Sequence, residues 1–67
     1  MPESPLAIIQ RRQIEVSVGE LLLTSDFYMR KEILERLRHL ISHADPSLNK
    51  QALSEVAQDE LRENDLL

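Results

Sequence analysis

The segment DFYMRKEILERLRHLISH, residues 26–43, constrains the fold more than any other part of the chain. Its apolar residues recur three and four positions apart, and residues at that spacing share one face of a helix. They are Met29, Ile33, Leu34, Leu37, Leu40 and Ile41. A helix divided in this way has to bury its apolar face against other helices. We therefore expect an all-α protein.

The length of the chain limits how that apolar face can be covered. A chain of 67 residues makes one domain, and chains this short bury only about 60% of their unfolded surface. They often need a disulfide, a metal or a second chain, and the absence of cysteine excludes disulfides and thiolate-bound metals. We expect a single domain over residues 1–67, with loose ends at 1–4 and 63–67. A two- or three-helix hairpin or bundle completed by homodimerisation fits these limits.

Three helices are expected from the capping residues. Ser4-Pro5 combines a capping hydroxyl with a proline at the first helical position, and predicts a helix that extends to Leu23. Residues 24–26 form a polar break, after which a second helix is expected to about His43. Asp45-Pro46 repeats the pattern of cap and proline, and predicts a third helix over residues 46–62.

Residues 12–18 (RQIEVSV) also fit a different structure. Ile14, Val16 and Val18 alternate with polar residues, which is typical of a half-buried strand. Such a strand would pair with its copy in a second subunit and give a dimeric DNA-binding transcriptional regulator of the ribbon–helix–helix kind. Glu15 would then face phosphate repulsion, and residues 19–24 are too few for the first helix of that fold. The helix is therefore the favoured interpretation.

The first helix carries two apolar stripes, which predicts contacts on two sides. One stripe contains Ile14, Val18, Leu21 and Leu22, and the other places Ile9, Val16 and Leu23 at heptad spacing. A helix that is apolar on two sides contacts its own chain on one side and a second chain on the other. We expect a protein interface formed by Ile9, Val16, Leu23, Phe27, Tyr28, Ile33, Leu37, Leu40 and Ile41. The aromatic pair within this set is either a core plug or a contact.

Charge is distributed unevenly along the chain. The net charge of −4 argues against nonspecific binding of nucleic-acid phosphates by the whole domain. The second predicted helix nevertheless carries more basic than acidic side chains. The basic ones are Arg30, Lys31, Arg36 and Arg38. We expect this basic face to select an acidic partner protein.

No pattern in the sequence indicates catalysis. The single glycine leaves no phosphate-binding loop, and no nucleophile motif is present. His39 and His43 share a helix face with Glu35, but a metal site needs more ligands than this set provides. No apolar run approaches the roughly 18 residues of a membrane span, and the first residues lack the features of a signal peptide. We expect a cytoplasmic, non-enzymatic protein that binds no cofactor, metal, membrane or small-molecule substrate.

The stretch from Leu21 to Asp45 resembles the small all-helical YmgB/AriR-type bacterial biofilm and acid-stress regulators. The matching positions are Leu21, Leu23, Asp26, Lys31, Ile33, Leu34, Leu37 and Leu40. After Pro46 the chain is more acidic and less aliphatic than that family. The resemblance implies a homodimer that docks onto a regulatory protein, and it supplies no catalytic residue. Both the residues and the resemblance thus predict a small protein-binding regulator or adaptor.

Overall fold

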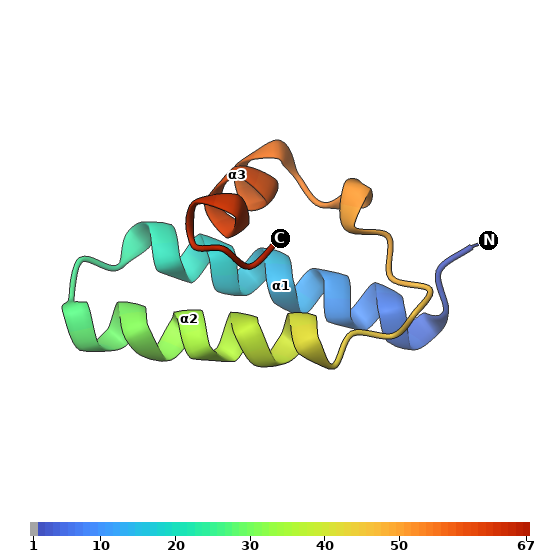
Figure 1. Ribbon diagram of the computed structural model, residues 1–67, viewed down its shortest axis with the longest axis horizontal. Coiled ribbons are helices and arrows are strands. Elements are labelled where there is room, and N and C mark those ends of the chain that lie inside the picture. The colour runs from blue at the N-terminus through green and yellow to red at the C-terminus, as the bar shows by residue number, and fades with distance from the viewer. Residues whose placement is uncertain (1) are drawn as a thin grey trace.

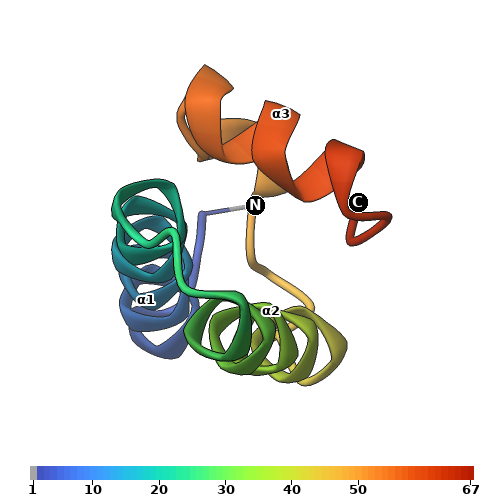
Figure 2. The ribbon, with the colours of Figure 1, turned by 90° about the vertical axis from the view of Figure 1, so that its left-hand side faces the viewer.

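Three α-helices make up the fold in the computed structural model, which describes residues 2–67. They are α1 (Pro5–Leu23), α2 (Phe27–Ser42) and α3 (Glu55–Glu63), and a short 3₁₀ turn, η1 (Lys50–Ala52), precedes α3. Helices α1 and α2 form an antiparallel hairpin, and α3 lies across it, packed chiefly on α1 (Figures 1 and 2). The prediction of a small all-α bundle is confirmed. Its completion by a second copy of the chain stays a prediction.

The starts of the first two helices are confirmed by their capping bonds. The Ser4 hydroxyl accepts a hydrogen bond from the Ala7 N–H at 3.1 Å, and the Asp26 carboxylate accepts one from the Met29 N–H at 2.9 Å. The alternative strand over residues 12–18 is wrong, because α1 runs through this segment without interruption. Its alternating pattern arises because α1 is apolar on two sides: Ile14 faces the core and Val16 faces outward.

All three helices contribute to one aliphatic core. The residues of the core are Ile14, Val18 and Leu21 from α1, Ile33 and Leu37 from α2, Leu53, and Ala57 and Leu61 from α3. Viewed along the hairpin, the three helices lie at the corners of a triangle (Figure 2). The core side chains from all three helices form one cluster. The chain therefore buries one stripe of α1 and the central stripe of α2 without help from a second chain.

The third helix begins later than the sequence predicted, at Glu55 rather than at Pro46. The Asp45 carboxylate accepts hydrogen bonds from the Ser47 N–H at 3.0 Å and from the hydroxyls of Ser47 and Ser4. These bonds hold Asp45 in a turn, so it does not cap a helix. Ser54 is the cap instead, because its hydroxyl accepts the Ala57 N–H at 3.1 Å.

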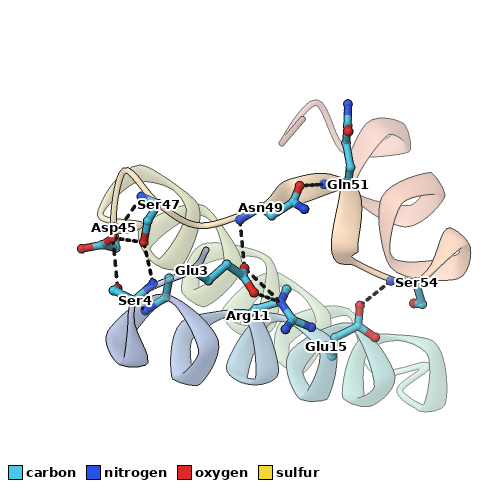
Figure 3. A network of polar contacts seen from close by, with 10 residues as sticks. Glu3, Ser4, Arg11, Glu15, Asp45, Ser47, Asn49, Gln51 and Ser54 are labelled. Atoms are coloured by element: carbon cyan, nitrogen blue, oxygen red, sulfur yellow. Dashed lines mark hydrogen bonds and ion pairs between the residues drawn. The ribbon is translucent and has the colours of Figure 1, made fainter. Parts of the chain in front are cut away.

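Residues near the N-terminus are fixed to the connection between α2 and α3 (Figure 3). The Ser4 N–H donates to the Ser47 hydroxyl at 2.9 Å, and the Glu3 carboxylate accepts the Asn49 N–H at 2.9 Å. Glu3 also pairs with Arg11 on α1 at 2.9 Å. We call these contacts, together with the bonds that Asp45 accepts from Ser4 and Ser47, the N-terminal clasp. They show that Glu3 and Ser4 do not belong to a loose end as predicted, whereas Met1 lies outside the described residues.

The C-terminal end is also more ordered than predicted. Asp65 adopts a left-handed backbone conformation with φ 58°, so that the Leu66 N–H reaches the Leu61 carbonyl at 2.8 Å. The Asp65 N–H donates to the Arg62 carbonyl at 3.1 Å. This bond pattern is a Schellman motif, which ends a helix and turns the following residue inward. Leu66 accordingly packs against the core.

Candidate protein-binding surface

The predicted interface residues separate into three groups by their burial. Ile33 and Leu37 are buried in the chain's own core, so their assignment to an intermolecular surface is corrected. They lie on the side of α2 that faces α1 and α3. Leu40 and Ile41 are half-buried against the same core. The exposed members are Ile9, Val16, Leu23, Phe27 and Tyr28.

Three exposed apolar side chains gather at the turn between α1 and α2, which we call the hairpin tip. Leu23 is 91% exposed, Phe27 72% and Tyr28 76%. The two aromatic rings meet edge to face, with centroids 5.5 Å apart and an angle of 82° between their planes. The tip lies at the opposite end of the hairpin from the N-terminal clasp (Figure 1). The aromatic pair is therefore on the surface and does not plug the core.

Hydrogen bonds from Arg30 stabilise the backbone of the hairpin tip. Its guanidinium donates to the Leu21 carbonyl at 2.7 Å and to the Thr24 carbonyl at 3.0 Å. These carbonyls lie at the end of α1 and at its cap, where no further helical turn supplies N–H donors. The Leu21 carbonyl also accepts the Thr24 N–H at 3.3 Å. Arg30 also lies 3.9 Å from the Glu60 carboxylate on α3. Arg30 was predicted to select a partner, but its contacts in the structure stabilise the turn.

The remaining basic residues of α2 differ in whether they form ion pairs within the chain. Arg36 pairs with Glu20 on α1 at 3.1 Å. Lys31 and Arg38 are exposed and form no ion pair with any of residues 2–67. Only these two members of the predicted basic face are therefore unengaged within the described chain.

A second surface feature is a groove between the outer sides of α1 and α2. Its volume is about 500 Å³, and its lining combines apolar side chains with an ion pair. The lining residues are Ile9, Arg12, Gln13, Val16, Ser17, Glu20, Arg36 and Leu40. We call it the α1–α2 groove. Among the polar members, Arg36 was predicted as part of the basic face, whereas Arg12, Gln13, Ser17 and Glu20 were missed as site residues because the site was predicted from apolar spacing and basic charge. Gln13 and Glu20 recur at the same heptad interval as Ile9 and Val16.

The exposed apolar surface also extends further than predicted. Leu22 is half exposed, although its spacing assigned it to the core stripe, and Met29 is 55% exposed. Both lie close in sequence to the hairpin tip. Spacing predicts which residues share a helix face, but not which of them are buried. Burial at the margin of the core depends on where α3 packs.

The two histidines form no larger cluster. The rings of His39 and His43 stack with centroids 4.2 Å apart, and Nδ1 of His43 lies 3.0 Å from the His39 carbonyl oxygen. Within residues 2–67 no group of three or more histidine, cysteine or carboxylate side chains could hold a metal ion. Over the same residues, none of the helices is both long enough and apolar enough to cross a membrane.

Two carboxylates with shifted pKa values belong to the N-terminal clasp. The hydrogen bond from the Asn49 backbone is the main cause that lowers the pKa of Glu3, with Arg11 adding to it. The Ser47 hydroxyl, followed by the Ser47 N–H, lowers the pKa of Asp45. In both cases the hydrogen bonds favour the charged form. These shifts therefore concern the stability of the fold, at a distance from the hairpin tip.

No protein-family model, curated protein or solved structure matches this chain. Its function therefore has to be inferred from the geometry of the tip and the groove.

Proposed function

We propose that the chain is a small non-enzymatic protein-binding module, a regulator or adaptor, which contacts another protein through its hairpin tip. The observation that carries this proposal is the exposure of Leu23, Phe27 and Tyr28, which flank the turn between α1 and α2. Placing the only two aromatic residues of the chain in water brings no stability to the fold. Aromatic residues of this kind are the anchors that dominate protein interfaces.

The rigidity of the tip supports the same function. Arg30 ties the turn to the end of α1, and Asp26 caps α2 directly before the aromatic pair. A surface that is already ordered loses less conformational entropy on binding than a flexible one. The turn that carries the anchors is therefore ordered by backbone contacts before binding, and its apolar side chains suit an apolar pocket or groove on the partner.

The exposed charges indicate the kind of partner. Lys31 follows the aromatic pair on α2, and Arg38 lies two turns further along, both without an ion pair in the described chain. Charges at the rim of an interface increase association rates and select against partners of like charge. We propose an acidic rim around the partner's apolar pocket. We place the module in the cytoplasm, in keeping with a chain that carries no cysteine.

Capture from a lysate of the source cells, with the full chain as bait, tests this proposal. The bait is compared with a Phe27→Ala/Tyr28→Ala double variant and with Val56→Ala, which removes an exposed apolar side chain from α3. We expect a defined protein to be retained by the wild type and by Val56→Ala, and lost from the double variant. Retention by all three baits would overturn the assignment of the tip.

Titration with random duplex DNA tests the competing DNA-binding function. The ribbon–helix–helix arrangement is excluded by the helix over residues 12–18, and Arg30 and Arg36 are engaged within the chain. We expect no binding at physiological salt. Tight binding that weakens steeply with added salt would contradict the proposal, because phosphate contacts release counterions.

A further inference from the structure

The outer face of α1 carries an apolar stripe that the fold leaves uncovered. Ile9, Val16 and Leu23 are spaced seven residues apart and are 54%, 62% and 91% exposed. They lie on the side of α1 opposite Ile14 and Leu21, which are buried in the core. A heptad-spaced stripe on one helix is the pattern by which helices pack along each other.

The stripe is symmetric about its central residue, and this symmetry indicates what covers it. We propose that the stripe binds the same stripe of a second copy of this chain, with the two α1 helices antiparallel and a two-fold axis at Val16. In that arrangement Val16 meets Val16 of the second copy, and Ile9 meets Leu23 of the second copy. Every exposed apolar side chain of the stripe then has an apolar partner, as an isologous interface requires.

The polar residues beside the stripe fit the antiparallel direction. On the flank next to α2, Gln13 lies opposite Glu20 of the second copy, so that an amide N–H can donate to a carboxylate. On the other flank, Arg12 lies opposite Gly19 of the second copy. A parallel pair in register would instead place Gln13 opposite Arg12 and Glu20 opposite Gly19 of the second copy, so that the Glu20 carboxylate would face no side-chain donor of the second copy.

Gly19 provides a second, independent observation that favours close packing of another chain on this face of α1. Apart from proline, glycine is the least favourable residue in the interior of a helix. The chain's own packing does not require it, because a Cβ placed on Gly19 would meet no atom within 4 Å. Close approach of another backbone or side chain is a common reason for a glycine at such a position. The second copy's Arg12 supplies that neighbour in the proposed pair.

In the proposed antiparallel pair, the second copy also covers the α1–α2 groove. A two-fold axis perpendicular to the two α1 helices places both α2 helices on the same side of the pair, which gives a four-helix bundle. Arg36 and Leu40, which line the groove from α2, then face the second copy. Arg36 already holds Glu20 in position to accept from Gln13 of the second copy. Leu23 belongs to both the stripe and the hairpin tip, whereas Phe27 and Tyr28 lie outside the stripe. This proposal rests on the stripe and on Gly19, so it does not depend on the proposed function, which is tested at Phe27 and Tyr28.

Cysteine cross-linking of the full chain tests both the pairing and its direction. The chain has no cysteine, so each single variant carries one thiol. We expect Val16→Cys to form a covalent dimer under mild oxidation, at a rate on the order of tenfold above that of Ser42→Cys, an exposed control at the end of α2. Ile9→Cys and Leu23→Cys should each remain uncoupled alone and couple to each other in a mixture.

Two other outcomes would overturn the proposal. Efficient coupling of Ile9→Cys to itself would show a parallel pair, and a Val16→Cys variant no faster than Ser42→Cys would show that the stripe does not meet its copy. Sedimentation equilibrium adds a test that needs no cross-link. Val16→Glu and Val16→Lys should each be monomeric with unchanged helix content, and an equal mixture should be dimeric, because opposite charges then meet at the axis. A mixture that stays monomeric contradicts the two-fold contact at Val16.

Discussion

Among single residues, Arg30 shows most clearly how much a side chain's role depends on its tertiary neighbours. From its position on α2 it reaches two carbonyls at the end of α1 and the Glu60 carboxylate on α3. Sequence reasoning grouped it with Lys31, Arg36 and Arg38 because only the charge was visible. Its contacts span six and nine residues across a turn whose geometry no local pattern specifies.

We predict that Arg30→Ala lowers the free energy of unfolding by about 1–2 kcal/mol, because two carbonyls lose a charged donor. The neighbouring Lys31→Ala should change it by less than about 0.5 kcal/mol, since Lys31 is exposed and unpaired among the described residues. Urea denaturation followed by circular dichroism measures both. Equal effects of the two substitutions would show that Arg30 does not stabilise the turn.

Among the elements, α1 and α2 were predictable almost to the residue, and the start of α3 was not. Ser4-Pro5 and Asp26 are caps whose bonds are made to the backbone three residues on, so the local sequence specifies them. Asp45 offers the same chemistry but is bound by Ser4, which lies far away in the sequence. Ser54 has a side chain that caps a helix as readily as that of Asp45. The choice between the two depended on contacts that form only in the folded chain.

The apolar stripes of α1 and α2 could likewise be recognised from the sequence. Which residues of each stripe are buried and which are exposed could not be predicted from it. We predict that Leu37→Ala lowers the free energy of unfolding by about 2–5 kcal/mol, because the side chain is fully buried and its removal leaves a cavity. Leu23→Ala makes the same chemical change at a residue that is 91% exposed, and should cost less than about 0.5 kcal/mol in dilute solution. Thermal unfolding compares them, and similar losses would contradict the burial pattern of the hairpin.

For the whole molecule, the N-terminal clasp determines how the two ends of the fold are joined. Glu3 and Ser4 contact residues 45–49, and Glu15 on α1 accepts the Ser54 N–H at 2.8 Å. The carboxylates of Glu3, Glu15 and Asp45 thus fix the connection between α2 and α3 against the N-terminal segment and α1 (Figure 3). These bonds were outside the reach of sequence reasoning, because their partners are more than thirty-five residues apart.

We predict that the clasp makes stability depend on pH in the acid range. The pKa values of Glu3 and Asp45 are lower in the folded chain than in the unfolded one, so the unfolded chain takes up protons first. Their stabilisation is complete above about pH 5 and is lost as the pH falls through about 4 and below. The melting temperature should therefore fall on acidification, and less steeply in Glu3→Gln than in the wild type.

Glu35→Gln is the matched control, because Glu35 is exposed on α2 and takes no part in the clasp. It should retain the pH dependence of the wild type. Identical pH profiles for the wild type and Glu3→Gln would show that the clasp carboxylate is not coupled to folding.

The clasp also has a consequence for the order in which the molecule assembles during translation. The α1–α2 hairpin has a turn of only three residues and can form as soon as α2 leaves the ribosome. Glu3 and Ser4 are synthesised before residues 45–49, so their bonds to that segment can form only after it has emerged. A nascent chain that stops before Asp45 therefore carries a hairpin whose first residues contact α1 but not yet the connection to α3.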